Sequence, residues 1–284
     1  MIKTILIAGA SGQVGSELIS YLKKNYKIIA TYNKSKKNLF KDKNVKWLKM
    51  DFSKQNIVKS RFDYIINCIA SHEFTRKITA KKYIESNIIC IKNLVSLGIK
   101  KKIKIFINFS TISVYGKVDK KILDEKYNKK NQNILGITKL IGENIIKYSS
   151  LNYVNLRLPG IITKTDSVRP WLNKIAFDIK NSKKISIFNL NNKFNSLIDV
   201  FELNKIIHLI IKKKKIRSEY NVSASKPIKV NNIIKYLKNK FSSSSRVIIK
   251  KKNTNTFLIS SKKIKKDLNY NAPSANQIIT RNFN

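Results

Sequence analysis

The pattern of apolar and polar positions changes near residue 160. Before it, Ile-rich runs of strand length alternate with amphipathic stretches of helix length. The predicted strands are Thr4–Ala8, Lys27–Thr31, Val45–Lys49, Tyr64–Cys68, Ile103–Phe109 and Tyr153–Leu158. The predicted helices are Val14–Lys24, Lys81–Leu97 and Thr138–Ser149. Strands with few internal charges are typical of a parallel sheet covered on both faces. The alternation therefore predicts an α/β fold with a doubly wound parallel sheet.

After residue 160 the pattern is looser. The elements expected there are a strand at Ile185–Asn189, helices at Val200–Lys213 and Val230–Lys240, and a strand at Arg246–Lys250. We expect residues 1–160 to form the larger domain, with 195–213 returning to it. Residues 161–194 and 214–284 are then expected to form a smaller C-terminal lobe.

A glycine motif, "GASGQVG" (9–15), lies between the first predicted strand and the first predicted helix. Gly9 permits a tight turn, Gly12 lets the backbone approach a pyrophosphate, and Gly15 lets the helix pack closely on the strand. The free N–H groups at the start of the helix then meet the pyrophosphate. With its flanking strand and helix, the motif predicts a Rossmann-type dinucleotide site that includes Ser11, Gln13 and Val14.

The segment after the second predicted strand bears on the choice of cofactor. An acidic residue there accepts hydrogen bonds from a ribose 2′-hydroxyl, whereas basic residues accommodate a 2′-phosphate. The stretch "ATYNKSKK" (30–37) contains no acidic residue. The residues in it that could donate hydrogen bonds to a phosphate are Asn33, Lys34, Lys36 and Lys37. The sequence therefore favours NADP, with NAD as the alternative.

The formal charge of +43 raises the question of a polyanionic partner. Seven of the 59 basic residues are Arg and 52 are Lys, spread along the whole chain. Nucleic-acid readers rely on Arg for bidentate contacts. Lys, Asn and Ile all have A/T-rich codons, so genome composition explains the bias more simply. We predict a solvated Lys-rich surface and no specific nucleic acid, with affinity for polyanions or membrane surfaces as the alternative.

Cysteine usage and hydropathy bear on location. Cys68 and Cys90 lie in apolar contexts without CxxC spacing, which indicates free thiols in a reducing compartment. No apolar run approaches the ~20 residues of a membrane helix, and the N-terminus lacks the pattern of a signal peptide. We expect a cytoplasmic protein without membrane insertion.

Several segments, taken in order along the chain, resemble the extended short-chain dehydrogenases/reductases, the NAD-dependent epimerase/dehydratase family. Besides the glycine motif, they are "KMDFSK" (49–54), "FDYIINCIAS" (62–71), "FINFSTISVYG" (106–116), "LRLPGII" (156–162), "NSLIDVFELNKII" (195–207), "EYNVSASKPIKVNNI" (219–233) and "ISSKKIKKDLNY" (259–270). The length and "GQVG" are similar to the family's shorter reductases, such as dTDP-4-dehydrorhamnose reductase. The further cofactor contacts that the resemblance implies are Asp51, Phe52, Ile69, Ala70, Ser71, Pro159, Gly160 and Ile161.

The family's reaction depends on a Ser/Thr and on Tyr-x-x-x-Lys. Thr111 falls at the Ser/Thr position, and "LGITKLIGE" (135–143) resembles the Tyr-x-x-x-Lys segment. Its Lys, here Lys139, is implied to bind the nicotinamide ribose. The Tyr position holds Leu135, which has no proton to give and no lone pair. Tyr115 belongs to a motif whose ring packs rather than reacts.

The resemblance implies a substrate-binding C-terminal lobe and a nucleotide-activated sugar as the small-molecule substrate, in surface-polysaccharide or sugar-nucleotide metabolism. One hypothesis is an NAD(P)-dependent reductase, epimerase or dehydratase that works without the Tyr, with water, Thr111, His72 or the substrate handling the proton. The alternative is a catalytically lapsed NADP(H)-binding sensor or scaffold. His72 and Glu73 follow the fourth predicted strand, where a His could act as acid or base. No metal site is predicted, and a homodimer is the oligomer that the resemblance suggests.

Overall fold

The computed structural model describes residues 2–36, 38–54, 58–71, 79–164, 170–250 and 256–284. The chain divides into two compact units. The first unit comprises Met1–Lys117, Asn128–Arg157 and Leu203–Tyr220, and the second comprises Val118–Tyr127, Leu158–Glu202 and Asn221–Asn284. The first unit thus takes in part of the 214–284 segment that the sequence analysis assigned to the lobe.

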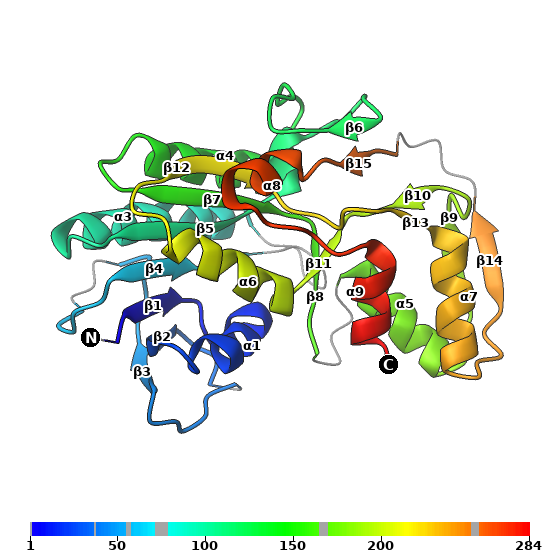
Figure 1. Ribbon diagram of the computed structural model, residues 1–284, viewed down its shortest axis with the longest axis horizontal. Coiled ribbons are helices and arrows are strands. Elements are labelled where there is room, and N and C mark those ends of the chain that lie inside the picture. Colours follow the sequence, from blue (N-terminus) through cyan, green and yellow to red (C-terminus); the bar gives the residue numbers. More distant parts are fainter. Residues whose placement is uncertain (1, 37, 55–57, 72–78, 165–169, 251–255) are drawn as a thin grey trace. The chain divides into compact units, whose positions relative to one another are not determined.

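A seven-stranded sheet in the order β12-β7-β5-β4-β1-β2-β3 forms the centre of the first unit (Figure 1). Its strands are β1 (Thr4–Ala8), β2 (Lys27–Tyr32), β3 (Val45–Lys49), β4 (Tyr64–Asn67), β5 (Ile105–Thr111), β7 (Tyr153–Leu158) and β12 (Arg217–Asn221). The pairs β1–β2, β1–β4, β2–β3 and β4–β5 are parallel. After β3 the chain crosses back to place β4 on the other side of β1, so the strand order reverses between β1 and β4 and the predicted doubly wound fold is confirmed.

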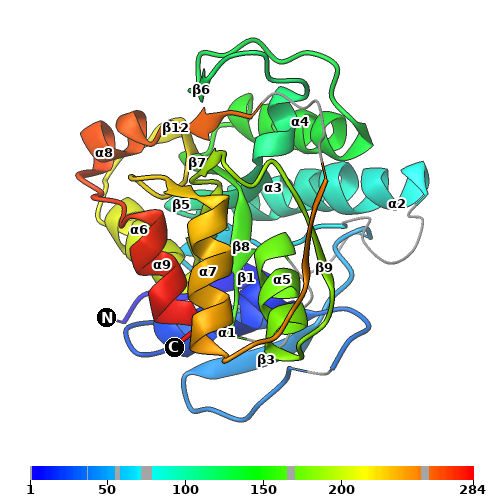
Figure 2. The same cartoon turned by 90° about the vertical axis from the view of Figure 1, so that its right-hand side faces the viewer.

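Helices cover both faces of this sheet, as Figures 1 and 2 show. They are α1 (Gln13–Leu22), α2 (Ala80–Ile84), α3 (Cys90–Lys100), α4 (Ile134–Lys147) and α6 (Val200–Ile211), of which α6 begins in the second unit. Leu94 of α3 and Ile146 of α4 join Leu6, Ile65 and Phe106 of the strands in one buried cluster. Burial of such side chains from water is the main favourable contribution to folding.

Two helices differ most from their predicted bounds. The predicted helix Lys81–Leu97 is interrupted by a π-helical turn, η1 (Glu85–Ile89), which joins α2 to α3. The helix predicted at Thr138–Ser149 begins four residues earlier, at Ile134, because the Asn133 side chain caps it by accepting the N–H of Gly136 at 2.9 Å. Leu135 therefore lies in the first turn of α4.

The second unit is built from short paired strands and helices. Its strands are β6 (Ile122–Leu123), β8 (Gly160–Ile162), β9 (Ile185–Phe188), β10 (Lys193–Phe194), β11 (Leu197–Asp199), β13 (Ile228–Lys229), β14 (Val247–Lys250) and β15 (Leu258–Ile259), and its helices are α5 (Trp171–Lys180), α7 (Val230–Lys240), α8 (Lys262–Leu268) and α9 (Ala275–Asn282). Apolar side chains of α5, α7 and α9 share one core, and α5 lies beside α7 in Figure 2. Within the described ranges, no helix has the length and apolarity needed to cross a membrane.

A buried ion pair ties α4 to the sheet of the first unit. Glu143 of α4 and Arg157 of β7 are 2% and 4% exposed, and the Arg157 Nη2 to Glu143 Oε2 distance is 2.7 Å. Arg157 Nε also donates to both carboxylate oxygens, and Ser110 Oγ of β5 donates to Oε1. Arg157 Nη1 donates to the Tyr115 hydroxyl at 2.8 Å. Because each charge is paired and hydrogen-bonded, the pair tolerates burial.

Substitution of Arg157 alone should destabilise the protein more than substitution of both Glu143 and Arg157. We expect Arg157→Met to lower the free energy of unfolding by about 3–5 kcal/mol, because Glu143 stays buried without its partner. Urea denaturation followed by circular dichroism measures the change. The double variant Glu143→Leu/Arg157→Met leaves neither charge of this pair buried without its partner and should be more stable than the single variant. Equal stability of the two variants would contradict this account.

Candidate functional site

The glycine motif forms the predicted turn between β1 and α1. Gly9 has φ +77°, and a Cβ on Gly15 would lie 2.7 Å from the Gly9 carbonyl oxygen. The N-cap residue of α1 is Gly12, so no side chain caps the start of this helix. The helix therefore begins with backbone N–H groups available to an anion, and the close approach of its first turn to the loop requires glycine. These features fit a dinucleotide pyrophosphate.

The ends of β2 and β3 contact this turn and each other. Thr31 of β2 accepts the N–H of Ala10 at its carbonyl oxygen, at 2.9 Å. The Asp51 carboxylate accepts the Ser53 hydroxyl at 2.6 Å and the Ser53 N–H at 3.0 Å. Hydrogen bonds from Ser53, and one from the side chain of Asn33, lower the pKa of Asp51. The structure thus brings the predicted residues Asn33 and Asp51 together, and Phe52 beside them is buried.

Lys139 of α4 lies inside the first unit with its side chain almost completely buried, at 2% exposure. Its ammonium donates to the carbonyl oxygen of Ile69 at 3.1 Å and to that of Phe109 at 3.0 Å. A Cβ on Gly9 would lie 3.0 Å from the backbone nitrogen of Ile69. The glycine turn, the segment after β4 and Lys139 are therefore adjacent. Ala70 is exposed and Ser71 is half-buried in the same segment.

Burial lowers the pKa of Lys139 to about 8, against the opposing influence of Cys68 and Glu143. Burial also raises the pKa of the Cys68 thiol to about 12, so this thiol is neutral at physiological pH. Both cysteines are free, as the sequence predicted. Lys139 is therefore the group of this region whose charge changes closest to neutral pH.

Thr111 and Leu135 lie on two elements that pack closely together. Thr111 ends β5, and its hydroxyl oxygen accepts the N–H of Ser113 at 3.2 Å at the start of the 3₁₀ turn η2 (Ile112–Tyr115). Gly136, next to the half-buried Leu135, packs so tightly that a Cβ on it would overlap the Ser113 carbonyl oxygen. This contact places the first turn of α4 against the turn that follows Thr111.

Neither neighbouring tyrosine of the first unit replaces the missing hydroxyl. Tyr115 is completely buried and its hydroxyl accepts a hydrogen bond from Arg157, which agrees with a packing role. Tyr148 lies at the opposite end of α4, about 20 Å from Leu135 by the helical rise of 1.5 Å per residue.

Sequence reasoning missed Asn87, a buried residue of the π-helical turn. Its side-chain nitrogen donates to the Thr138 hydroxyl at 3.0 Å, while Oδ1 has no hydrogen-bond partner among the described residues. π-Helical turns often occur at functional sites, and an unpaired buried oxygen calls for a ligand or water. The available signal was a polar residue, Asn87, directly before the apolar residues "IICI" (88–91) in a predicted helix.

Some predicted site residues lie elsewhere. Pro159, Gly160 and Ile161 belong to the second unit, where Gly160 begins β8 and pairs with Leu197 of β11. His72, Glu73 and Lys37 lie outside the described residues. The described residues contain no group of three His, Cys, Asp or Glu side chains placed to hold a metal ion.

The second unit contains an apolar pocket of about 530 Å³. Trp171 and Phe194 meet edge to face in its wall, with ring centroids 5.2 Å apart. Phe188 and Phe257 also line it, and the polar lining includes Asn189, Asn192, Lys174 and Lys193. An apolar pocket with a few polar groups is typical of a small-molecule site.

The fold and the glycine turn together define a doubly wound α/β protein of the Rossmann type. The chain belongs to the NAD dependent epimerase/dehydratase family, whose model matches residues 5–223.

The chain is also similar to several known proteins. The chain is 26% identical over 258 residues to dTDP-D-glucose 4,6-dehydratase of Dictyostelium discoideum, covering 78% of this chain but only 58% of that protein's length. The enzyme WbmG of Bordetella bronchiseptica, solved in complex with NAD, has a TM-score of 0.86 at 15% identity, with 99% of this chain and 92% of that chain covered. UDP-glucuronic acid 4-epimerase of Bacillus cereus, also solved with NAD, has a TM-score of 0.83 at 18% identity, with 99% and 100% covered. The two structural likenesses establish the fold.

The depressed pKa of Lys139 predicts a pH-dependent stability. The folded state releases its proton near pH 8 and the unfolded state near 10.4, so between these values the unfolded state binds more protons. Stability from this group must then rise with pH across that interval. Measured by urea denaturation, wild type should gain stability relative to Lys139→Met as the pH rises from about 8 to about 10. The exposed-site control Lys235→Met should show no such trend, and a pH-independent difference for Lys139→Met would refute the assignment.

Proposed function

We propose that this protein is an NAD(P)-dependent reductase, epimerase or dehydratase of a nucleotide-activated sugar, acting in surface-polysaccharide or sugar-nucleotide metabolism. The observation that carries the proposal is the buried Lys139, held between the segment after β4 and the end of β5 and adjacent to the glycine turn. Burying a lysine that has no ion-pair partner among the described residues costs free energy, and such buried charges are typical of functional sites. The curated relative is a sugar-nucleotide dehydratase by name, and one structural neighbour is a UDP-sugar epimerase.

In this proposal the first unit holds the cofactor. The glycine turn, with Ser11, Gln13 and Val14, receives the pyrophosphate, and Asp51 and Phe52 lie along the adenosine half. Lys139 holds the nicotinamide ribose, with Ile69, Ala70 and Ser71 beside it. When bound, the cofactor supplies hydride transfer.

The second unit supplies the substrate lobe in this proposal. Its aromatic pocket suits the flat base of a nucleotide, because Trp171, Phe194 and Phe257 offer ring surfaces for stacking. The polar side chains of Asn189 and Asn192 can satisfy the edge of the base.

Leu135 decides how the proton moves. A positioned general acid or base contributes roughly 10²–10⁴-fold to a rate, so its loss slows a hydride step without forbidding it. The Thr111 hydroxyl can hydrogen-bond a substrate oxygen, and the proton itself passes to water or to another group of the substrate. Lys139, with a pKa of about 8, keeps a positive charge nearby at neutral pH, which stabilises a developing oxyanion.

The same leucine favours a second candidate function. A protein that retains the cofactor turn and Lys139 but has an apolar residue at the Tyr position could serve as an NADP(H)-binding sensor or scaffold without turnover. The two functions differ in whether the wild-type protein changes a nucleotide sugar.

Substitution of Leu135 separates the two functions. Wild type, Leu135→Tyr and the hydroxyl-free control Leu135→Phe are incubated with UDP-glucose or dTDP-glucose and NAD⁺, and with the corresponding 4-keto sugars and NADPH. Nicotinamide absorbance and chromatography of the sugars report turnover. We expect slow turnover by wild type and a rise of roughly 10²-fold in Leu135→Tyr alone. Activity confined to Leu135→Tyr would identify a lapsed enzyme, whereas wild-type NADPH binding with no turnover in any variant would count against the enzyme proposal.

We further propose that NADP is the preferred cofactor. Lys34 and Lys36 are exposed after β2, and residues 30–37 hold no carboxylate to repel a 2′-phosphate. Wild type should bind NADPH more tightly than NADH in fluorescence titrations. Lys34→Glu should weaken NADPH binding about tenfold and leave NADH binding nearly unchanged, since one charge-assisted contact is replaced by repulsion. Lys24→Glu, at the far end of α1, is the charge-matched control, and equal wild-type affinities for the two cofactors would contradict the preference.

Oligomer and location stay predictions. The exposed side chains of Ile134, Ile137 and Ile141 lie along one face of α4, which supports pairing of two copies through this helix. The two free thiols, Cys68 and Cys90, support a reducing compartment such as the cytoplasm.

A further inference from the structure

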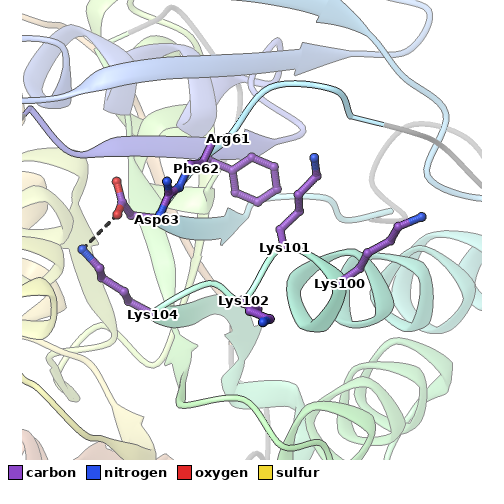
Figure 3. Close-up of a pocket in the computed structure, with 7 residues that line it drawn as sticks. All are labelled: Arg61, Phe62, Asp63, Lys100, Lys101, Lys102 and Lys104. Atoms are coloured by element: carbon purple, nitrogen blue, oxygen red, sulfur yellow. Dashed lines mark ion pairs between the residues drawn. The ribbon is translucent and has the colours of Figure 1, made fainter.

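A basic pocket of about 400 Å³ lies at the amino ends of β4 and β5 (Figure 3). This is the edge of the sheet opposite the glycine turn, which follows the carboxyl end of β1. Two segments line the pocket, Arg61–Asp63 before β4 and Lys100–Lys104 between α3 and β5. The buried ring of Phe62 provides an apolar wall.

The charges around this pocket are strongly unbalanced. Its lining carries five cationic side chains and one carboxylate, that of Asp63. Asp63 is already engaged, because it pairs with Lys104 Nζ at 2.9 Å and accepts the N–H of Thr4 at 2.9 Å. Lys101 Nζ donates to the Lys59 carbonyl oxygen, which leaves its charge uncompensated. The cationic side chains of the lining therefore exceed its carboxylates by four charges, which favours an anion in the hollow.

Arg61 distinguishes this pocket from the general lysine surface. Arginine is scarce in this chain, and Arg157, Arg217 and Arg281 are committed to carboxylates or carbonyl oxygens. Arg61 is exposed and its guanidinium makes no hydrogen bond within the described part of the chain, although it attracts the Asp63 carboxylate electrostatically. It also lines a second hollow of about 260 Å³, together with Lys27, Lys43, Lys46 and Ser60. Two neighbouring basic hollows thus share one planar donor suited to bidentate phosphate contacts.

The end of α3 explains only part of this arrangement. A lysine in the last turn, such as Lys100, stabilises the helix dipole. Lys102, however, has φ +51°, a left-handed conformation that favours Gly or Asn at a helix end. Neither effect accounts for Arg61, which comes from a different segment.

We propose that this pocket, with Arg61 at its border to the second hollow, binds an oligophosphate: a small ligand with at least two linked phosphate groups. A single carboxylate or phosphate would leave most of the positive charge uncompensated, whereas linked phosphates offer several negative charges to the cations of the two hollows, which share Arg61. The shared chemistry could come from free inorganic oligophosphate or from the triphosphate of a nucleotide.

Calorimetric titration of the full-length protein with sodium tripolyphosphate tests the proposal. Arg61→Gln/Lys100→Gln/Lys102→Gln removes the three cations of the pocket whose side chains make no hydrogen bond to another described residue. Lys235→Gln/Lys238→Gln/Lys240→Gln, at the end of α7, removes the same charge from the second unit and is the matched control. Parallel titrations use ATP and a single-stranded RNA oligonucleotide.

We expect wild type and the control to bind tripolyphosphate and the pocket variant to bind it about tenfold more weakly, since three exposed charge contacts are lost. The same loss with ATP would identify a nucleotide triphosphate as the source, and no ATP binding would identify free oligophosphate. The proposal is overturned if wild type does not bind tripolyphosphate, if the pocket and control variants bind it equally, or if the pocket variant loses affinity for RNA alone.

Discussion

The buried pair of Glu143 and Arg157 is the interaction on which the geometry of the first unit depends. Leu135, Lys139 and Glu143 are spaced four residues apart, so they lie along one face of α4. When Arg157 of β7 and Ser110 of β5 hold the carboxylate, they fix the rotation of the whole helix against the sheet. That rotation directs Lys139 to the Ile69 and Phe109 carbonyl oxygens and leaves Leu135 at the start of the helix. A shift of one residue would remove Lys139 from the interior.

The same constraint keeps the cofactor-binding features independent of the side chain at position 135, where we propose that a proton donor has been lost. The Lys139 ammonium is held by backbone carbonyl oxygens rather than by a tyrosine hydroxyl, and the glycine turn is held by close backbone approach. Neither depends on the side chain at position 135. Cofactor binding and proton transfer are therefore separable properties of this fold, and the proposed loss of one leaves the structural basis of the other in place.

Periodicity predicted six of the seven sheet strands, because most of them are buried and read as continuous apolar runs. It missed the seventh strand, β12, whose sequence "RSEYN" is mostly polar. The predicted bounds match those of the strands Val45–Lys49 and Tyr153–Leu158 and of the helix Val230–Lys240. The π-helical turn at Glu85–Ile89 was not predictable from spacing, because a single inserted residue leaves the apolar pattern almost unchanged. The short strands of the second unit were mostly missed, since two- and three-residue strands carry no readable alternation.

The sequence by itself determined the class of fold, the glycine turn and the family, because these depend on local spacing and on residue types such as glycine at a positive φ. It also placed Leu135 and Lys139 in one motif. Only the tertiary structure decided that Lys139 is buried between two carbonyl oxygens, that Asn87 has an unpaired oxygen, and that Arg61 and Lys100–Lys104 border one hollow. Those properties arise from contacts between residues far apart in the chain, which the packing of helices on the sheet alone brings together.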